Sequence, residues 1–147
     1  MKKVILRGRG VVGGIIEGEA LVTRERISAN MGLDPWTGLI IEKGHELEGK
    51  SVKGRVLVFP YGKGSDAWGG VLYSACRRGN GPLAIINRKA DSFVINGVIA
   101  AKIPMVIVVD SDPSEMIQSG DHVKVDAGRG LVEAHRPEDT HPPDEGR

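Results

Sequence analysis

The sequence predicts an α/β fold in which a barrel-like or layered sheet carries two or three helices. Early in the chain, short apolar stretches are separated by glycines, which is typical of strands joined by turns. In the middle, strand-like and helix-like stretches alternate, which indicates parallel strands joined by right-handed crossovers. Finally, the chain contains 21 glycines and only 4% aromatic residues, which favours many turns over a helical bundle.

The bulk properties are those of one domain, because 147 residues suffice to bury a core. The 20 Lys and Arg balance 19 Asp and Glu, so charge gives no reason to expect a nucleic-acid or membrane partner. No apolar stretch is long enough to span a membrane, and Arg7 interrupts the start too early for a signal peptide. We therefore expect a cytoplasmic protein. Cys76 is the only cysteine, so the chain alone is expected to hold no metal or iron–sulfur cluster.

The first elements are short strands. A strand is expected at 3–6, and the pattern G-x-G-x-x-G follows at 8–13. A dinucleotide site needs a helix directly after that pattern, but 14–22 is strand-like and interrupted by glycines. Two strands joined at glycines are therefore the favoured interpretation. The stretch 27–35 has turn chemistry and is expected to form a long loop that contacts a partner or closes over the sheet; a short strand is expected at 39–41.

A second nucleotide-binding pattern, G-x-x-x-x-G-K-S, occupies 44–51. The Lys and Ser of a P-loop open a helix, but only three residues separate Ser51 from the next expected strand. Glu46 and Glu48 would also repel a phosphate inside such a loop. We interpret this segment as a charged surface turn between two strands.

The centre of the chain is a strand, a glycine-rich turn and a helix start. The apolar stretch 56–59 predicts a strand, and Pro60 ends it because proline cannot donate to a ladder. Gly62 and Gly64 permit backbone conformations and close approaches that other residues resist. A helix is expected to follow over 67–78.

Ser65 lies where this turn meets the helix. Either Ser65 or Asp66 can cap the helix. Lys63 and the N–H groups at the helix start bring positive charge to the turn, which predicts an anion site around the Ser65 hydroxyl. The alternative interpretation is a plain connection in which the serine is only a cap.

Apolar spacing predicts the remaining elements. They are a strand at 82–87, a helix at 92–102, a strand at 105–109, a helical turn at 113–118, and strands at 121–126 and 131–134. The last residues, 136–147, are polar and rich in proline, so we expect a disordered tail after a single domain, 1–135.

Six segments carry a resemblance to a known family. They are Gly-Glu-Ala-Leu-Val (18–22), Gly-Leu-Asp-Pro-Trp-Thr-Gly (32–38), Gly-Arg-Val-Leu-Val-Phe-Pro-Tyr-Gly-Lys-Gly-Ser (54–65), Ala-Ile-Ile-Asn (84–87), Ala-Lys-Ile-Pro-Met-Val (101–106) and Ser-Gly-Asp-His-Val-Lys-Val-Asp (119–126). In this order they resemble the small subunit of the aconitase X family, and most closely its archaeal phosphomevalonate dehydratase branch. The resemblance extends over about residues 7–134, and Gly-Lys-Gly-Ser after an apolar strand is its most specific part.

This resemblance implies a swivelling β/β/α domain like the mobile domain of aconitase. It also implies a heterodimer with a large subunit that carries an iron–sulfur cluster of the [4Fe-4S] type, while this chain holds no cofactor. The implied reaction is loss of water from (R)-5-phosphomevalonate to give trans-anhydromevalonate 5-phosphate, a step of isoprenoid biosynthesis. Ser65 matches the proton acceptor of the family, and Gly62, Lys63 and Gly64 are expected to bind the anionic substrate.

Two alternatives to this function remain open. The family usually has a second Ser or Thr after the catalytic serine, but here Asp66-Ala67-Trp68 follows, and Ala29-Asn30-Met31 replaces the usual residues nearby. A related branch dehydrates cis-3-hydroxy-L-proline, and this chain is alternatively a small subunit of that kind. The third interpretation is a non-catalytic swivel module that docks a partner.

Overall fold

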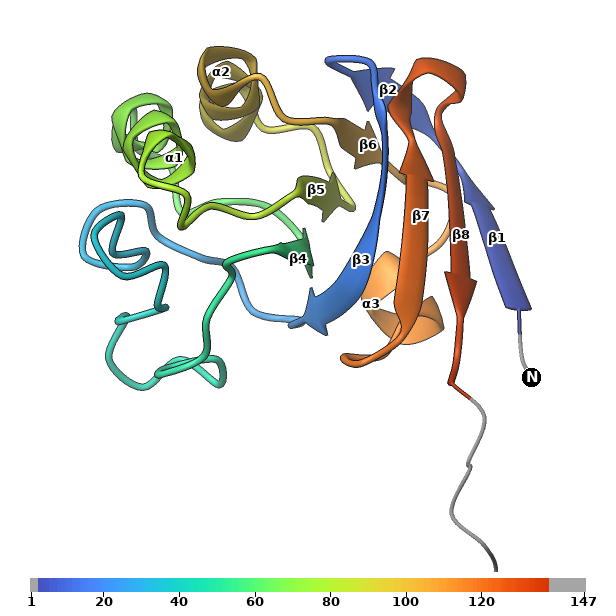
Figure 1. Ribbon diagram of the computed structural model, residues 1–147, viewed down its shortest axis with the longest axis horizontal. Coiled ribbons are helices and arrows are strands. Elements are labelled where there is room, and N and C mark those ends of the chain that lie inside the picture. Colours follow the sequence, from blue (N-terminus) through green and yellow to red (C-terminus); the bar gives the residue numbers. More distant parts are fainter. Residues whose placement is uncertain (1–2, 138–147) are drawn as a thin grey trace, which may run out of the picture.

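One mixed sheet of eight strands, in the order β1-β8-β7-β3-β4-β5-β6-β2, organises the computed structural model, which describes residues 3–137 (Figure 1). The strands are β1 (Lys3–Arg7), β2 (Arg9–Val11), β3 (Ile15–Val22), β4 (Arg55–Val58), β5 (Ala84–Asn87), β6 (Met105–Ile107), β7 (His122–Asp126) and β8 (Leu131–His135). The helices of the described part are α1 (Ala67–Arg77), α2 (Ser92–Ala101), α3 (Pro113–Met116) and a 3₁₀ turn, η1 (Ala127–Arg129). The predicted fold class is confirmed.

The sheet closes on itself at Gly8. The strands β1 and β2 lie at opposite ends of the strand order, yet Gly8 alone separates them in the chain. A Cβ at Gly8 would lie 2.1 Å from the carbonyl oxygen of Ile107, and one at Gly10 would lie 1.6 Å from that of Ala127. Gly8 and Gly10 of the G-x-G-x-x-G pattern therefore permit close packing of backbones, and the strands β2 and β3 stand there, as expected, in place of the helix of a dinucleotide site.

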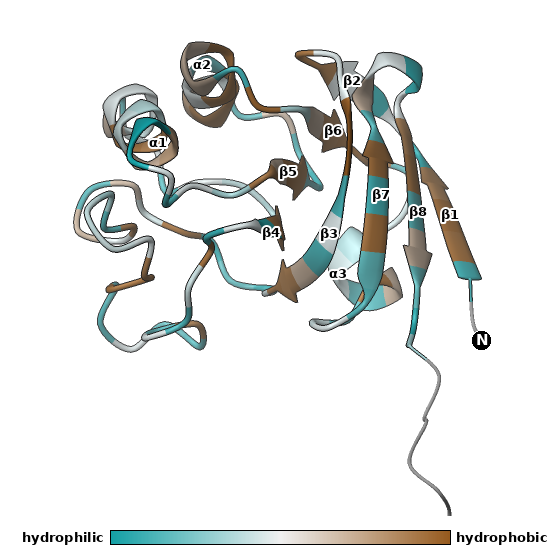
Figure 2. Ribbon diagram, in the orientation of Figure 1, coloured by the Kyte–Doolittle hydropathy of each residue, from teal (hydrophilic) through white to brown (hydrophobic). Residues whose placement is uncertain are grey.

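The central strands are buried on both faces. Along β4, Val56 and Val58 join one hydrophobic cluster, whereas Leu57 and the following Phe59 join the other. This alternation has the period of two that a strand imposes. The cluster with Val56 and Val58 lies inside the closed sheet. The cluster with Leu57 and Phe59 lies between the sheet, the helices α1 and α2 and the long segment 23–54. In Figure 2 the strands β4, β5 and β6 are brown, which means that they are hydrophobic. Strands buried on both faces read as continuous apolar stretches in the sequence, which is why these elements could be predicted.

The long segment 23–54 differs from its prediction. The stretch 39–41 forms no strand, and instead makes isolated bridges that pair Ile40 with Leu33 and Leu39 with Ser51. Short turns satisfy some of its backbone groups, as when Gly38 N–H donates to the carbonyl oxygen of Asp34 at 2.7 Å, and bonds between its own stretches, such as Ile41 N–H to the carbonyl oxygen of Gly32, satisfy others. The predicted strand is wrong because the neighbouring stretches curl back within the segment and do not extend alongside it.

The end of the domain is tied to the sheet. His135 is the last residue of β8, and the guanidinium of Arg136 donates to the buried carboxylate of Asp121 at 3.2 and 3.4 Å. The rest of the predicted disordered tail, 138–147, lies outside the described residues. Across residues 3–137, no helix has both the length and the apolar character needed to cross a membrane.

Candidate active site

The predicted site loop, 60–66, leaves the carboxyl end of β4 and leads into α1. It shares this edge of the sheet with the ends of β5 and β6, which run parallel to β4. Crevices at the carboxyl ends of parallel strands are the usual ligand sites of α/β proteins. The loop also meets the long segment 23–54, because Gly62 bridges to Ile27.

Both backbone polar groups of Gly62 are hydrogen-bonded to side chains. Its N–H donates to Asp91 Oδ2 at 2.8 Å, and its carbonyl oxygen accepts hydrogen bonds from Arg26 Nη2 at 3.0 Å and Nε at 3.3 Å. A Cβ at this position would lie 2.5 Å from Trp68 Nε1, so only glycine fits. Because the Gly62 N–H already donates to Asp91, it is not available to bind an anion. Only N–H groups later in the loop could do so.

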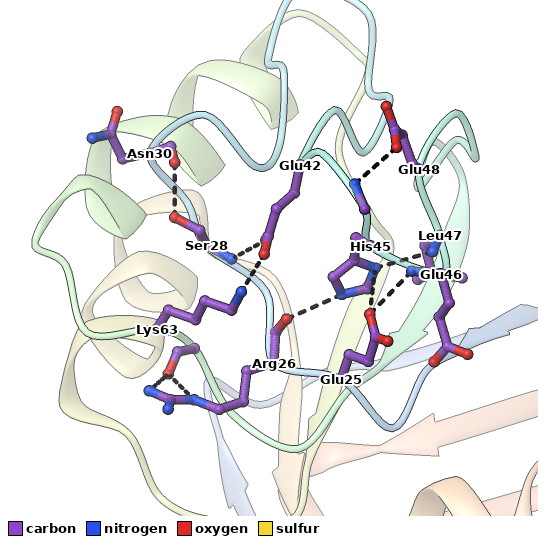
Figure 3. A network of polar contacts seen from close by, with 12 residues as sticks. Glu25, Arg26, Ser28, Asn30, Glu42, His45, Glu46, Leu47, Glu48 and Lys63 are labelled. Atoms are coloured by element: carbon purple, nitrogen blue, oxygen red, sulfur yellow. Dashed lines mark hydrogen bonds and ion pairs between the residues drawn. The ribbon is translucent and has the colours of Figure 1, made fainter.

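The ammonium of Lys63 is paired with the carboxylate of Glu42 (Figure 3). Glu42 also accepts the Ser28 N–H at 2.9 Å, and its side chain is 16% exposed. Burial by itself would raise the pKa of the Glu42 carboxyl, but the hydrogen bonds from Lys63 and Ser28 outweigh it and lower that pKa overall. The positive charge expected at Lys63 is therefore balanced by a partner that the sequence did not indicate.

Ser65 is half-buried and forms the turn before α1. Its Oγ accepts the Ala67 N–H at 3.1 Å, whereas Asp66, the residue that precedes the helix, makes no side-chain cap. Of the two expected caps, Ser65 is thus the one that is used. Within residues 3–137, the N–H groups of Gly64, Ser65 and Asp66 have no hydrogen-bond acceptor. These N–H groups lie next to the hydroxyl and at the positive end of α1, which suits a negative charge there.

A basic hollow opens beside Lys63, between the loop and the segment 23–54. It is lined by Arg24, Glu25, Arg26, Glu42, Lys43, Gly44, His45 and Lys63. Four of these side chains are cationic and two are carboxylates, so the lining carries an excess of positive charge. Several of the lining side chains are connected by hydrogen bonds and ion pairs (Figure 3).

His45 connects two stretches of chain at the edge of this hollow. Its buried ring donates from Nε2 to the carbonyl oxygen of Arg26 at 3.0 Å, and Nδ1 accepts the Leu47 N–H at 3.0 Å. These two partners place the ring proton on Nε2. The segment with the P-loop pattern is a turn, as expected, because no helix begins between Ser51 and β4. It does not join two strands, since none forms at 39–41, and its residues His45 and Leu47 are buried. It contributes one wall of the hollow.

Sequence reasoning missed Asp91, Arg26 and Glu42. Asp91 carried a usable signal, since an Asp before Ser-Phe-Val is a good helix cap, and its carboxylate does accept the Phe93 N–H. Arg26 and Glu42 carried none, because each meets the loop across 21 to 36 residues of chain.

An aconitase X swivel domain model matches residues 5–134 of the chain. The chain belongs to the aconitase X swivel domain family. The small subunit of phosphomevalonate dehydratase from Methanosarcina acetivorans is 41% identical over 137 residues, 93% of this chain and 95% of the relative. The same subunit from Methanocella arvoryzae is 46% identical over 87% of this chain and 97% of its own length.

Solved structures agree with this family assignment. The holo-form of aconitase X from Thermococcus kodakaraensis superimposes with a TM-score of 0.83 at 40% identity, over 89% of this chain and 98% of that chain. A solution structure of a UPF0107 protein gives a TM-score of 0.82 at 44% identity, with the same coverage. The resemblance seen in the sequence and the swivel domain that it implies are both confirmed.

The residues of this swivel domain do not suit an iron–sulfur cluster. Cys76 is its one cysteine, on α1, and burial raises the pKa of the thiol, which opposes the thiolate form that a cluster requires. Within residues 3–137, no three His, Cys, Asp or Glu side chains gather in a way that could hold a metal ion.

Proposed function

We propose that this swivel domain is the small subunit of a hydro-lyase that dehydrates (R)-5-phosphomevalonate to trans-anhydromevalonate 5-phosphate. The observation that carries the proposal is the similarity, over most of the chain, to proteins named as small subunits of phosphomevalonate dehydratase. The larger subunit would hold the iron–sulfur cluster, because the residues here do not suit one. Activity would then require both subunits, and the reaction would belong to isoprenoid biosynthesis in the cytoplasm.

In this proposal Ser65 accepts the proton from carbon 2, next to the substrate carboxylate. The reaction removes a proton from carbon 2 and hydroxide from carbon 3, which together make one water, and leaves a double bond between these carbons. A serine is a weak base at neutral pH, so its oxyanion needs electrostatic support. The N–H groups of residues 64–66 and the start of α1 supply such support within the chain.

The basic hollow is the proposed site of the substrate phosphate. Carbon 2 and the phosphorus are five bonds apart, or about 6 Å, and two residues of chain span at most about 7 Å. Lys63 lies at the hollow and two residues before Ser65. A phosphate near Lys63 thus suits a reacting carbon near Ser65. cis-3-Hydroxy-L-proline has no phosphate, so the cationic lining favours phosphomevalonate over this alternative.

The decisive test replaces Ser65 by alanine in the complex with the larger subunit. We expect turnover to fall about a hundredfold or more, the scale of losing a general base. Loss of the bond to Ala67 should cost only about 0.5–2 kcal/mol of stability. The measurement is the turnover number beside the melting curve of the same complex.

Ser74→Ala is the matched control, because Ser74 lies further along α1 and its hydroxyl only accepts a bond from Arg78. This control should keep both turnover and melting temperature. Near-normal turnover of Ser65→Ala with a lowered melting temperature would show that Ser65 is only a cap, and would support the non-catalytic interpretation.

A further inference from the structure

The carboxylate of Asp91 serves two parts of the molecule at once. One oxygen, Oδ1, caps α2 by accepting the N–H groups of Phe93 at 2.9 Å and Val94 at 3.4 Å. The other, Oδ2, accepts the N–H of Gly62 at 2.8 Å, across 29 residues of sequence. The start of α2 is thereby joined to the loop that carries Ser65.

Arg26 holds the same loop from the opposite side. Its guanidinium makes two hydrogen bonds to the carbonyl oxygen of Gly62 and lies 4.5 Å from the centre of the Tyr61 ring. The same peptide group is also bound at its other end, because the Lys63 N–H donates to the carbonyl oxygen of Ile27 at 3.1 Å. Three successive residues of the loop are thus attached to the body of the domain.

Below the loop lies a rigid aromatic pair. Trp68 is fully buried and stacks on Phe59, with ring centroids 5.6 Å apart and an angle of 14° between the planes. Gly62 packs so closely on the indole that a Cβ would lie 2.5 Å from Nε1. The indole of Trp68 therefore prevents the backbone of Gly62 from moving toward the core. The hydrogen bonds that join Gly62 to Asp91 and Arg26 restrict its movement in the other directions.

We propose that Asp91 is a positioning residue for the dehydration, with Arg26 as its counterpart. By holding the N–H and the carbonyl oxygen of Gly62, which belong to two consecutive peptide groups, the two side chains set where the Ser65 hydroxyl lies, three residues later. Neither touches the reacting atoms in this proposal, which rests on the proposed function of Ser65 as proton acceptor. Displacing a reacting group by about 1 Å can cost about a hundredfold in rate, so a shift of this peptide should reduce turnover.

The test is Asp91→Ser in the complex with the larger subunit. Serine is a good helix cap, so α2 should keep its cap, but its shorter side chain cannot also reach Gly62. We expect kcat to fall about tenfold or more, with KM and melting temperature nearly unchanged. Asp112→Ser is the matched control, since Asp112 caps α3 through the Ser114 N–H at 3.0 Å and, within residues 3–137, makes no hydrogen bond to the loop itself; its kcat should stay normal.

Amide hydrogen exchange of the chain provides a readout that does not depend on activity. In Asp91→Ser, the Gly62 amide should exchange faster while the amides of Phe93 and Val94 keep their protection. If Asp91 were only a helix cap, the substitution would speed exchange of the Phe93 and Val94 amides and leave the Gly62 amide protected. That pattern, or a normal kcat, would overturn the proposal.

Arg26→Met keeps the proposal testable if Asp91→Ser does not fold. This substitution removes both donors to Gly62 without touching α2, and it should also lower kcat. Because Arg26 also lines the basic hollow, KM should rise as well, so kcat is the readout of the positioning role. A normal kcat in Arg26→Met, with Ser65→Ala inactive, would overturn the positioning role alone. A normal kcat in Ser65→Ala would instead overturn the proposed function on which the inference rests.

Discussion

The carboxylate of Glu42 fixes the position of the Lys63 ammonium by pairing with it. Glu42 binds the Lys63 ammonium and the Ser28 N–H, and these bonds outweigh burial in lowering its pKa. A depressed carboxyl pKa adds stability that is present above the ordinary value, near 4.5, and is lost as pH falls through the folded value. Glu42 therefore makes the fold sensitive to acid.

Glu42→Gln tests this contribution. At pH 7 the substitution should lower the free energy of unfolding by about 1 kcal/mol, because a charged hydrogen bond to Lys63 is lost. The difference from the unchanged chain should shrink as pH falls below the ordinary carboxyl pKa of 4.5, as measured by urea unfolding at a series of pH values. The exposed Glu115 on α3 provides the control Glu115→Gln. A difference that grows toward low pH would contradict this account.

Arg24 and Lys43 test the proposed phosphate site without altering the loop itself. Each cation should stabilise a bound phosphate by about 1 kcal/mol at the surface, or about fivefold in affinity. Arg24→Ala with Lys43→Ala should therefore raise KM for phosphomevalonate by about tenfold or more, with kcat nearly unchanged. Lys53→Ala, on a turn outside the hollow, should leave KM alone. An unchanged KM in the double variant would show that the phosphate does not bind in this hollow.

At the scale of elements, the contact between α1 and α2 depends on Gly97. A Cβ there would lie 2.9 Å from the carbonyl oxygen of Trp68 and 2.8 Å from Leu72 Cδ1. The two helices therefore approach closely because one of them has no side chain at this point. Since α1 begins two residues after Ser65, its distance from α2 also affects the candidate site.

Gly97→Ala should destabilise the domain by about 1–3 kcal/mol, the usual cost of overpacking a core. The matched control is Gly70→Ala on α1, where an added Cβ meets nothing within 4 Å. This control should stabilise the domain by about 0.5–1 kcal/mol, because alanine favours a helix more than glycine does. Urea unfolding of both variants provides the comparison, and a stabilised Gly97→Ala variant would show that the helices can move apart freely.

At the scale of the whole molecule, the long segment 23–54 exposes large apolar side chains. Met31 is 75% exposed and Trp36 is 68% exposed, although both belong to a segment whose other apolar residues are largely buried. The ring of Trp36 is partly covered by Arg78, whose guanidinium lies 3.4 Å from the ring centre. Such side chains are typical of surfaces that a partner covers.

We expect this chain and the larger subunit to elute together in size-exclusion chromatography, and dehydration to appear only in the mixture. Anaerobic reconstitution should place the iron in the larger subunit, because one cysteine cannot hold a cluster. Iron and sulfide content of each separated subunit is the measurement. A stable stoichiometric cluster on this chain alone, or full activity of the larger subunit alone, would contradict the expectation.

Much of the fold could be predicted from local sequence. The strand β4, the glycine-rich loop and α1 were each predicted within a residue or two, because apolar period, Pro60 and the Ser65 cap act over short distances. The double burial of β4 to β6 was implied by their continuous apolar residues. The strand predicted at 39–41 did not form, because its apolar residues pack within a curled segment and do not pair along a neighbour.

By itself, the sequence determined the order of elements, the family and the place of Ser65 after a buried strand, because these depend on neighbouring residues and on motif. The tertiary structure alone decided that Glu42 balances Lys63 and that Asp91 and Arg26 hold Gly62. Each of these contacts joins residues 21 to 36 positions apart. No local pattern specifies them, since they arise only when the segment 23–54 and the start of α2 pack against the same end of the sheet.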